Sequence, residues 1–69
     1  MPRGFFMGHH IAFWNRREIW VGESREDFNQ KRDILDSRKI KHAYRQLGWT
    51  WYIYVHRKDE EEAEFLIRR

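Results

Sequence analysis

Residues 49–57 constrain the fold more than any other stretch of the sequence. They are rich in aromatic and β-branched side chains, which favour a β-strand. Alternate side chains of a strand point to opposite faces. One face then carries Trp51, Ile53 and Val55, and the other carries Thr50, Tyr52, Tyr54 and His56. Because both faces are largely apolar, we expect this strand at the centre of a sheet.

Two helices are predicted, each from a capping residue and an apolar stripe. Ser24 begins the first, because its hydroxyl can accept a hydrogen bond from an amide of the first turn. This helix ends near Arg38, and Lys39 stands where glycine is usual. Asp59 is expected to cap the second helix, with Glu62 three residues later in the pattern of a capping box. The stripe of the first helix comprises Phe28, Lys31, Ile34 and Leu35, and that of the second comprises Ala63, Leu66 and Ile67.

Shorter strands are predicted at residues 18–22 and 40–47, so the order is strand, helix, strand, strand, helix. This order predicts an α+β fold with a three-stranded sheet, order 1-3-2, and both helices on one face. Such a fold is one half of a ferredoxin-like domain. We expect a single domain over residues 17–69. Residues 1–16 are an N-terminal arm, either flexible or packed on the sheet.

The chain has 69 residues and no cysteine, so neither disulfides nor thiolate metal ligands can hold it together. Its 4 Trp, 3 Tyr and 5 Phe can supply a core instead. The absence of cysteine fits a reducing compartment. No apolar run approaches the roughly 20 residues of a membrane span, and no signal-peptide cleavage site is apparent. We therefore expect a cytoplasmic protein.

The net charge of +3 permits an anionic partner but does not require one. The charges are unevenly distributed along the chain. A basic run comprises Arg38, Lys39, Lys41 and Arg45, and an acidic run comprises Asp59, Glu60, Glu61, Glu62 and Glu64.

Several short motifs spread over residues 17–67 carry a resemblance to a known family. They are Asp33-Ile34-Leu35-Asp36, Ile40, Tyr52-Ile53-Tyr54-Val55, and Glu61-Glu62-Ala63 with Leu66. These motifs resemble the small prokaryotic signal-transducing proteins, a family of unknown function. Lys39 replaces the small residue usual in that family before the second strand. The resemblance implies the strand and helix order given above and a bacterial cytosolic module with a signalling role. It supplies no catalytic residues.

We expect no enzymatic activity, no cofactor and no bound metal. Ser24 and Ser37 lie at predicted helix ends, and the carboxylates of residues 59–62 suit the positive start of a helix. His42 and His56 lie on neighbouring predicted strands, where they could approach each other. Zinc, however, needs three or four converging ligands.

If both helices cover one face of the sheet, the other face carries aromatic side chains. The candidate binding residues there are Trp20, Lys41, Arg45, Tyr52 and Tyr54. Aromatic rings flanked by cations are also typical of platforms for single-stranded nucleic acid. Lys41 and Arg45 share the face of the tyrosines only if their strand has the matching phase, which would favour nucleic acid.

The occupant of this face stays open at this point, because an apolar patch of this size is rarely bare in a monomer. The arm could fold over it through Phe5, Phe6, Phe13 and Trp14. A second copy or another protein could cover it instead. We expect a non-catalytic interaction or signalling module with a protein partner or as a homodimer, acting through this face or a sheet edge. Single-stranded nucleic acid is the alternative partner. A membrane surface ranks below both, because glycines weaken the amphipathic helix that it would need.

Overall fold

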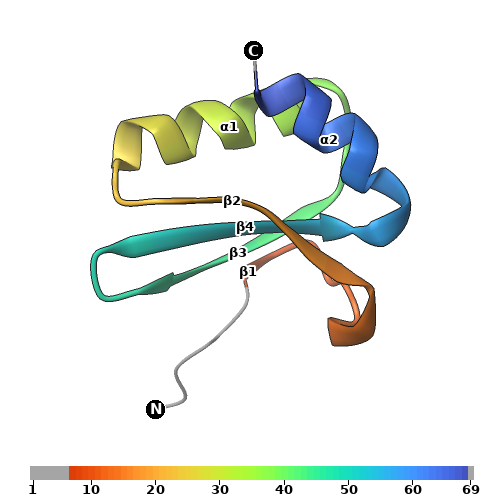
Figure 1. Cartoon of the computed structure of the whole chain (residues 1–69), viewed down its shortest axis with the longest axis horizontal. Helices are drawn as coiled ribbons and strands as arrows, with labels where there is room; N and C mark the ends of the chain where they lie inside the picture. Colours follow the sequence, from red (N-terminus) through yellow and green to blue (C-terminus); the bar gives the residue numbers. More distant parts are fainter. Residues whose placement is uncertain (1–6, 69) are drawn as a thin grey trace.

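The computed structural model describes residues 7–68 of the chain. Its elements are β1 (Met7–Gly8), η1 (Phe13–Asn15), β2 (Arg16–Gly22), α1 (Arg25–Ser37), β3 (His42–Leu47), β4 (Thr50–His56), η2 (Arg57–Asp59) and α2 (Glu60–Ile67), where η marks a short 3-10 turn. Both α-helices lie on one side of the sheet, and η1 lies toward the other side (Figure 1). The described chain therefore has a helical layer, a sheet, and a short segment with η1 on the side of the sheet away from the helices.

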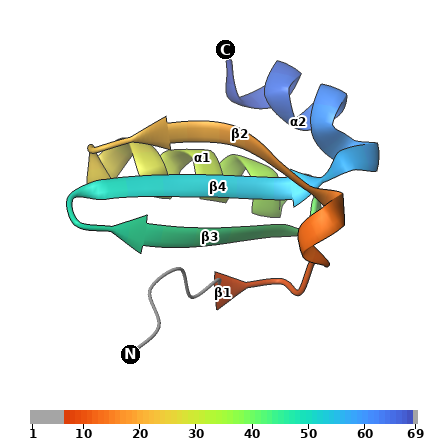
Figure 2. The same ribbon diagram turned by 60° about the horizontal axis from the view of Figure 1, so that its bottom comes forward.

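The sheet has four strands in the order β1-β3-β4-β2, and every neighbouring pair is antiparallel. The α+β class is confirmed, and β4 lies between β2 and β3. The prediction of a three-stranded sheet is wrong, because Met7 and Gly8 pair with Tyr44 and Ala43 and add a strand beside β3 (Figure 2). Two residues show no readable alternation, so the sequence pattern could not predict this strand.

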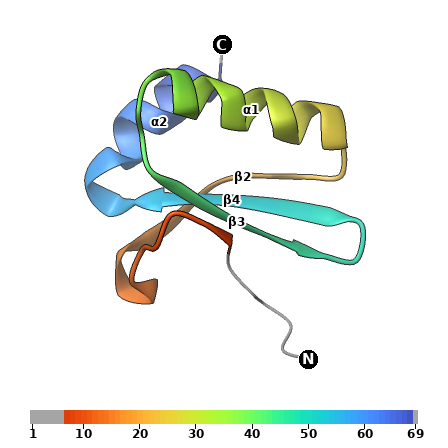
Figure 3. The same ribbon diagram turned by 180° about the vertical axis from the view of Figure 1, so that it is seen from behind.

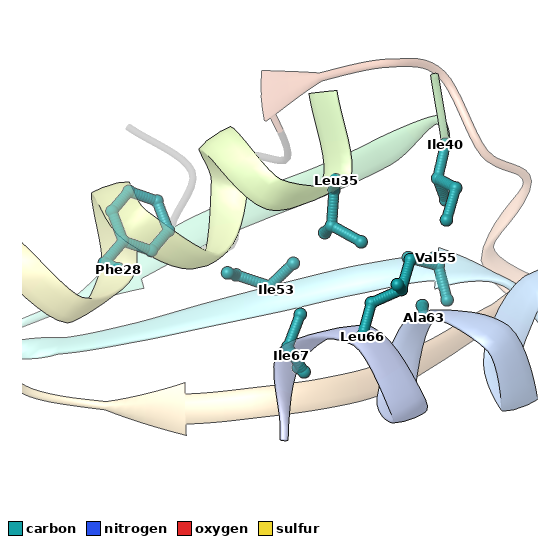
Figure 4. Close-up of a cluster of buried hydrophobic side chains, with 8 residues drawn as sticks. All are labelled: Phe28, Leu35, Ile40, Ile53, Val55, Ala63, Leu66 and Ile67. Carbon is teal, nitrogen blue, oxygen red and sulfur yellow. The ribbon is translucent and has the colours of Figure 1, made fainter. Parts of the chain in front are cut away.

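The core lies between the sheet and the two helices. Figure 4 shows its buried side chains, which are Phe28, Leu35, Ile40, Ile53, Val55, Ala63, Leu66 and Ile67. Phe28 stacks on Trp51 with ring centroids 4.3 Å apart and meets Tyr44 edge to face at 5.3 Å. Rings bury a large area for each side chain, which allows a short chain without disulfides to form a core.

The two helices begin differently, although both follow a residue type that favours capping. The Ser24 hydroxyl accepts a hydrogen bond of 3.2 Å from the Asp27 N–H, so the predicted cap of α1 is confirmed. Asp59 precedes α2 but its side chain makes no capping hydrogen bond, so that prediction is wrong. The reason is local, because the chain reaches α2 through η2 and Asp59 has φ −103° and ψ 2°. A capping residue usually needs an extended backbone.

The end of α1 is closed by a backbone motif centred on Lys39. The Ile40 N–H donates to the Leu35 carbonyl and the Lys39 N–H donates to the Asp36 carbonyl, each at 2.9 Å. This pair of bonds is a Schellman motif, which needs a left-handed residue after the last helical turn. Lys39 supplies that conformation with φ 60°. The motif directs the buried side chain of Ile40 into the core beside Leu35.

A bulge in β2 changes the direction in which its side chains point. Glu18 pairs with Tyr54, but the next registered pair is Trp20 with Ile53, so Ile19 is an extra residue between them. Trp20 therefore faces the helices and packs against the core. The prediction that Trp20 shares a face with the tyrosines is wrong for this reason.

Residues 9–15, which we call the strap, connect β1 to β2. These strands lie at opposite edges of the sheet, so the strap must cross it. Figure 3 shows the crossing on the side away from the helices, near the end where β4 meets η2. The Ile11 side chain is buried, and its carbonyl accepts a 2.9 Å hydrogen bond from Nε of Arg16. Within residues 7–15 of the predicted arm, Met7 and Gly8 thus pair with β3 and Ile11 is buried, and residues 1–6 lie outside the described residues.

Candidate functional site

The surface of the sheet that points away from the helices is called the tyrosine face. The register defines its members, because directly paired residues of an antiparallel sheet share a face. Ala43 pairs with Tyr54 and Arg45 pairs with Tyr52, on the side opposite the core residues of β4. The members are Arg16, Glu18, Val21, Ala43, Arg45, Leu47, Thr50, Tyr52, Tyr54 and His56.

Arg45 lies over two tyrosine rings of β4. Its guanidinium carbon is 5.1 Å from the ring centroid of Tyr52 and 5.9 Å from that of Tyr54. The two rings are stacked with centroids 6.4 Å apart and planes at 23°. Each cation–π contact at such a site contributes about 0.5–1 kcal/mol. We call these three residues the Arg–Tyr cluster, and their mutual contacts favour this orientation of the rings.

Electrostatics keep the Tyr54 hydroxyl protonated. Burial raises the pKa of Tyr54 above its ordinary value of 10.0, and the Glu18 carboxylate raises it further. The charge of Arg45 and a hydrogen bond from it act in the opposite direction, but they do not outweigh burial. The phenol is therefore neutral at physiological pH, with a cation on one neighbouring strand and an anion on the other.

The strap divides the tyrosine face into two parts. Ala43 is 1% exposed and Tyr54 is 9% exposed, although both point away from the helices. We infer that the strap supplies this cover, because it crosses on their side of the sheet (Figure 3) and its Ile11 is 4% exposed. Val21, beyond the strap, is 49% exposed. We call the two parts the covered end, with Ala43 and Tyr54, and the open end, with Val21, Arg45, Leu47 and Tyr52.

Three of the residues predicted for binding come together in this surface, namely Arg45, Tyr52 and Tyr54. Lys41 is exposed and precedes β3, outside the paired residues. Trp20 lies on the helical side, as described above. Sequence reasoning also missed Val21, because unbroken alternation places it with Ile19 and only the bulge turns it toward the tyrosines.

The large aromatic side chains of the strap do not cover the sheet. Phe13 and Trp14 are 72% and 66% exposed and pack edge to face on each other, with centroids 5.3 Å apart. Ile11 is the buried strap residue instead. Phe5 and Phe6, which the sequence offered for the same role, lie outside the described residues.

The described histidines do not form a metal centre. His42 pairs with Val55 and faces the helices, whereas His56 pairs with Arg16 on the tyrosine face, so the two side chains point apart. Within residues 7–68, no group of three His, Asp or Glu side chains could hold a metal ion.

In the same part of the chain, no helix has the length and apolar character needed to cross a membrane.

Comparison with known proteins adds no relative. No family model matches the chain, and neither a curated protein nor a solved structure matches it. The resemblance to the small prokaryotic signal-transducing proteins therefore stays a prediction from the motifs in the sequence.

Proposed function

We propose that this chain is a non-catalytic interaction module that binds a protein partner through the open end of the tyrosine face. The Arg–Tyr cluster carries the proposal, because it lies beside the exposed Val21 and the half-buried Leu47. Tyrosine and arginine are over-represented among residues that dominate binding energy at protein interfaces. The contacts within the cluster favour one arrangement of its side chains, which would lower the entropy that binding costs.

The chemistry of the cluster suits binding better than proton transfer. A general base works best with a pKa near the pH of the reaction. The pKa of Tyr54 is raised from 10.0, which is the wrong direction for such a base. The Arg45 guanidinium stays charged throughout the physiological range. The cluster therefore offers hydrogen bonds, a positive charge and ring surface to a partner.

Single-stranded nucleic acid is the alternative partner, and the geometry supports it less. Arg45 does share the face of the tyrosines, which favours this alternative. A stacking platform, however, presents several exposed rings to successive bases. Tyr54 is covered and Trp20 faces the helices, so Tyr52 is the one predicted ring at the open end. Glu18 also belongs to this face, and its charge would repel phosphates.

The tyrosine face is a better candidate for the binding surface than the outer edge of β2. Within the described residues β2 pairs only with β4, so this edge is open to another strand. The bulge between Glu18 and Trp20 interrupts its regular hydrogen-bonding pattern. Bulges of this kind discourage the addition of a further strand.

The proposal includes a signalling role in the bacterial cytoplasm. That role rests on the family resemblance of the motifs, and the cysteine-free composition suits a reducing compartment. A homodimer is the case in which the partner is a second copy of this chain.

The test uses peptides selected from a random displayed library against the full chain. Val21→Glu places a charge in the open end, and Phe65→Glu is the matched control, because Phe65 is an exposed apolar residue of α2 in the helical layer. We expect Val21→Glu to lower peptide affinity by about tenfold or more. Phe65→Glu should leave it unchanged.

Equal affinity of both variants for the selected peptides would contradict the proposal. Tight binding of short single-stranded RNA that weakens steeply with salt would overturn it in favour of nucleic acid. A dimer in solution that Val21→Glu dissociates would support the proposal, with a second copy as the partner.

A further inference from the structure

Two large aromatic side chains of the strap are left in solvent. Phe13 and Trp14, which we call the ring pair, begin η1 and are both mostly exposed. The turn that carries them is tied down, because the Asn15 N–H donates to the Ala12 carbonyl at 2.8 Å and the preceding Ile11 is buried. Adjacent exposed rings on a surface are typical of an interaction site.

The end of the sheet that carries the ring pair is rich in cations. Arg16 and Arg17 follow η1 directly, and residues 1–17 contain no Asp or Glu. Arg16 pairs with His56, the last residue of β4, so η1 and η2 lie at the same end of the sheet (Figure 2). η2 adds the exposed cations Arg57 and Lys58. This end is therefore both apolar and basic.

Carboxylates of α2 offset a part of this charge. Glu60 lies 3.7 Å from Nε of Arg17. The cations of η2 share a shallow depression with three carboxylates of α2, namely Glu60, Glu61 and Glu64. These carboxylates belong to the helical layer, whereas η1 lies toward the other side of the sheet (Figure 1). The ring pair thus lies on the side where the chain supplies cations and, up to residue 17, no carboxylate.

We propose that η1 is an anchor for an anionic lipid surface. Phe13 and Trp14 enter the boundary between headgroups and acyl chains, and the neighbouring cations contact the lipid phosphates. Aromatic rings favour this boundary, and the indole N–H of Trp can donate a hydrogen bond to a headgroup. The glycines that weaken an amphipathic helix do not count against this site, because two rings on a short turn need no such helix. The inference goes beyond the proposed function and does not depend on it.

The size and geometry of the ring pair favour lipid over a macromolecule. A stable protein interface buries about 800 Å² on each partner, whereas one Phe or Trp supplies roughly 150–250 Å². Single-stranded nucleic acid stacks its bases on open ring faces. Here the two ring planes meet edge to face at 81°, so the rings do not form a parallel platform. Insertion at a lipid surface requires only buried apolar area and attraction between opposite charges.

The proposed anchor leaves the binding face accessible. The open end of the tyrosine face lies beside the turn between β3 and β4, since Val21 pairs with Tyr52 and Leu47 pairs with Thr50. Figure 2 shows this turn and η1 at opposite ends of the sheet. A chain held at a membrane by η1 therefore still presents the open end to a protein partner.

The first test is flotation of the full chain with vesicles of equal parts phosphatidylcholine and phosphatidylglycerol. We expect the wild type to float with them and to bind phosphatidylcholine alone about tenfold more weakly, because each cation near an anionic surface strengthens binding about fivefold. Phe13→Ser with Trp14→Ser should lower the partition coefficient about tenfold or more. Phe65→Ser with Trp49→Ser is the matched control, because these side chains are 67% and 83% exposed elsewhere on the surface.

The contribution of charge is tested with one cation at each end of the sheet. Arg57→Gln should weaken binding to the anionic vesicles about fivefold and leave binding to phosphatidylcholine unchanged. Arg25→Gln is the control, because Arg25 begins α1 near the turn between β3 and β4 (Figure 2). It should leave both affinities nearly unchanged.

Insertion of the rings is measured with brominated phosphatidylcholine, which quenches the fluorescence of tryptophan that reaches the acyl chains. Quenching of the wild type should be lost in Trp14→Phe and retained in Trp49→Phe. Both changes are conservative and lie at exposed positions, so they test insertion in a folded chain. Matching amide spectra of the wild type and all variants check the fold.

A wild type that stays in the dense fraction with both kinds of vesicle would overturn the anchor. Equal flotation of the two double variants, or quenching that persists in Trp14→Phe, would also overturn it. Tight binding of short single-stranded RNA that Phe13→Ser with Trp14→Ser abolishes, without flotation of the wild type, would assign the ring pair to nucleic acid instead. None of these measurements involves the selected peptides, so failure of the anchor leaves the proposed function standing.

Discussion

Lys39 has the most strained backbone among the described residues, because it is the one non-glycine residue there with a positive φ. The left-handed conformation brings Cβ close to the following carbonyl oxygen. The Schellman motif nevertheless needs this conformation to direct Ile40 into the core. The burial of Ile40 in the core therefore outweighs the strain at Lys39. A residue without a Cβ atom would remove this strain.

Lys39→Gly is therefore expected to stabilise the chain. Glycine relieves the left-handed strain, and this gain exceeds the cost of the greater freedom that glycine gives the unfolded chain. The free energy of unfolding should therefore rise by about 0.5–1 kcal/mol. For a domain of this size, this corresponds to about 2–8 °C in melting temperature. Arg38→Gly is the control, because Arg38 has φ −100° and gains nothing from glycine. A melting temperature that falls in Lys39→Gly would contradict this account of the helix end.

At the level of elements, the sequence predicts the long regular segments and misses the irregular ones. The stripe at Phe28 and Leu35 and the alternation at residues 50–56 each repeat over several residues, so they predict α1 and β4. The bulge at Ile19 breaks an alternation only once, and it leaves no signature in residue type. The face of Trp20 and of Val21 could therefore not be predicted. Asp59 shows the same limit, because a 3-10 turn before α2 changes its backbone.

The pairing of β1 depends on the absence of a side chain at Gly8. A Cβ there would lie 2.7 Å from the His42 carbonyl oxygen, which is too close for any real contact. Gly8→Ala should therefore separate β1 from β3 and expose the His42 amide to hydrogen exchange at neutral pH. Gly48→Ala is a matched control, because Gly48 also has a positive φ of 59° but a Cβ there meets nothing within 4 Å. Equal protection of the His42 amide in both variants would show that β1 does not hold the strap.

At the scale of the whole molecule, the packing of a helical layer on one face of the sheet follows from the positions of the apolar residues in the sequence. Both helices must bury their stripes against the same face of β4, so the α+β class was predictable from the sequence. The partition of the opposite face was not predictable, because it depends on a strap whose single buried apolar residue, Ile11, stands among more prominent aromatic neighbours. The tyrosine pair could be found from alternation, whereas the cover over Tyr54 could not.

The pH dependence of global stability follows from two buried groups. The pKa of His42 is lowered from 6.5, so the unfolded chain binds more protons below that pH and stability falls as the pH drops through about 6.5. The pKa of Tyr54 is raised from 10.0, so the unfolded chain loses its proton first and stability falls as the pH rises above about 10. Urea unfolding followed by tryptophan fluorescence should show a plateau between these limits. His42→Gln and Tyr54→Phe should each flatten one side, and an unchanged profile in both would contradict the assignment.

The most direct test of the binding face is the set of backbone amide shifts that a selected peptide causes in the labelled chain at neutral pH. We predict that the largest changes occur at Val21, Arg45, Leu47 and Tyr52, and that α2 is unaffected. Changes concentrated on α2, or on the exposed Phe13 and Trp14, would place the binding surface elsewhere and contradict the central claim.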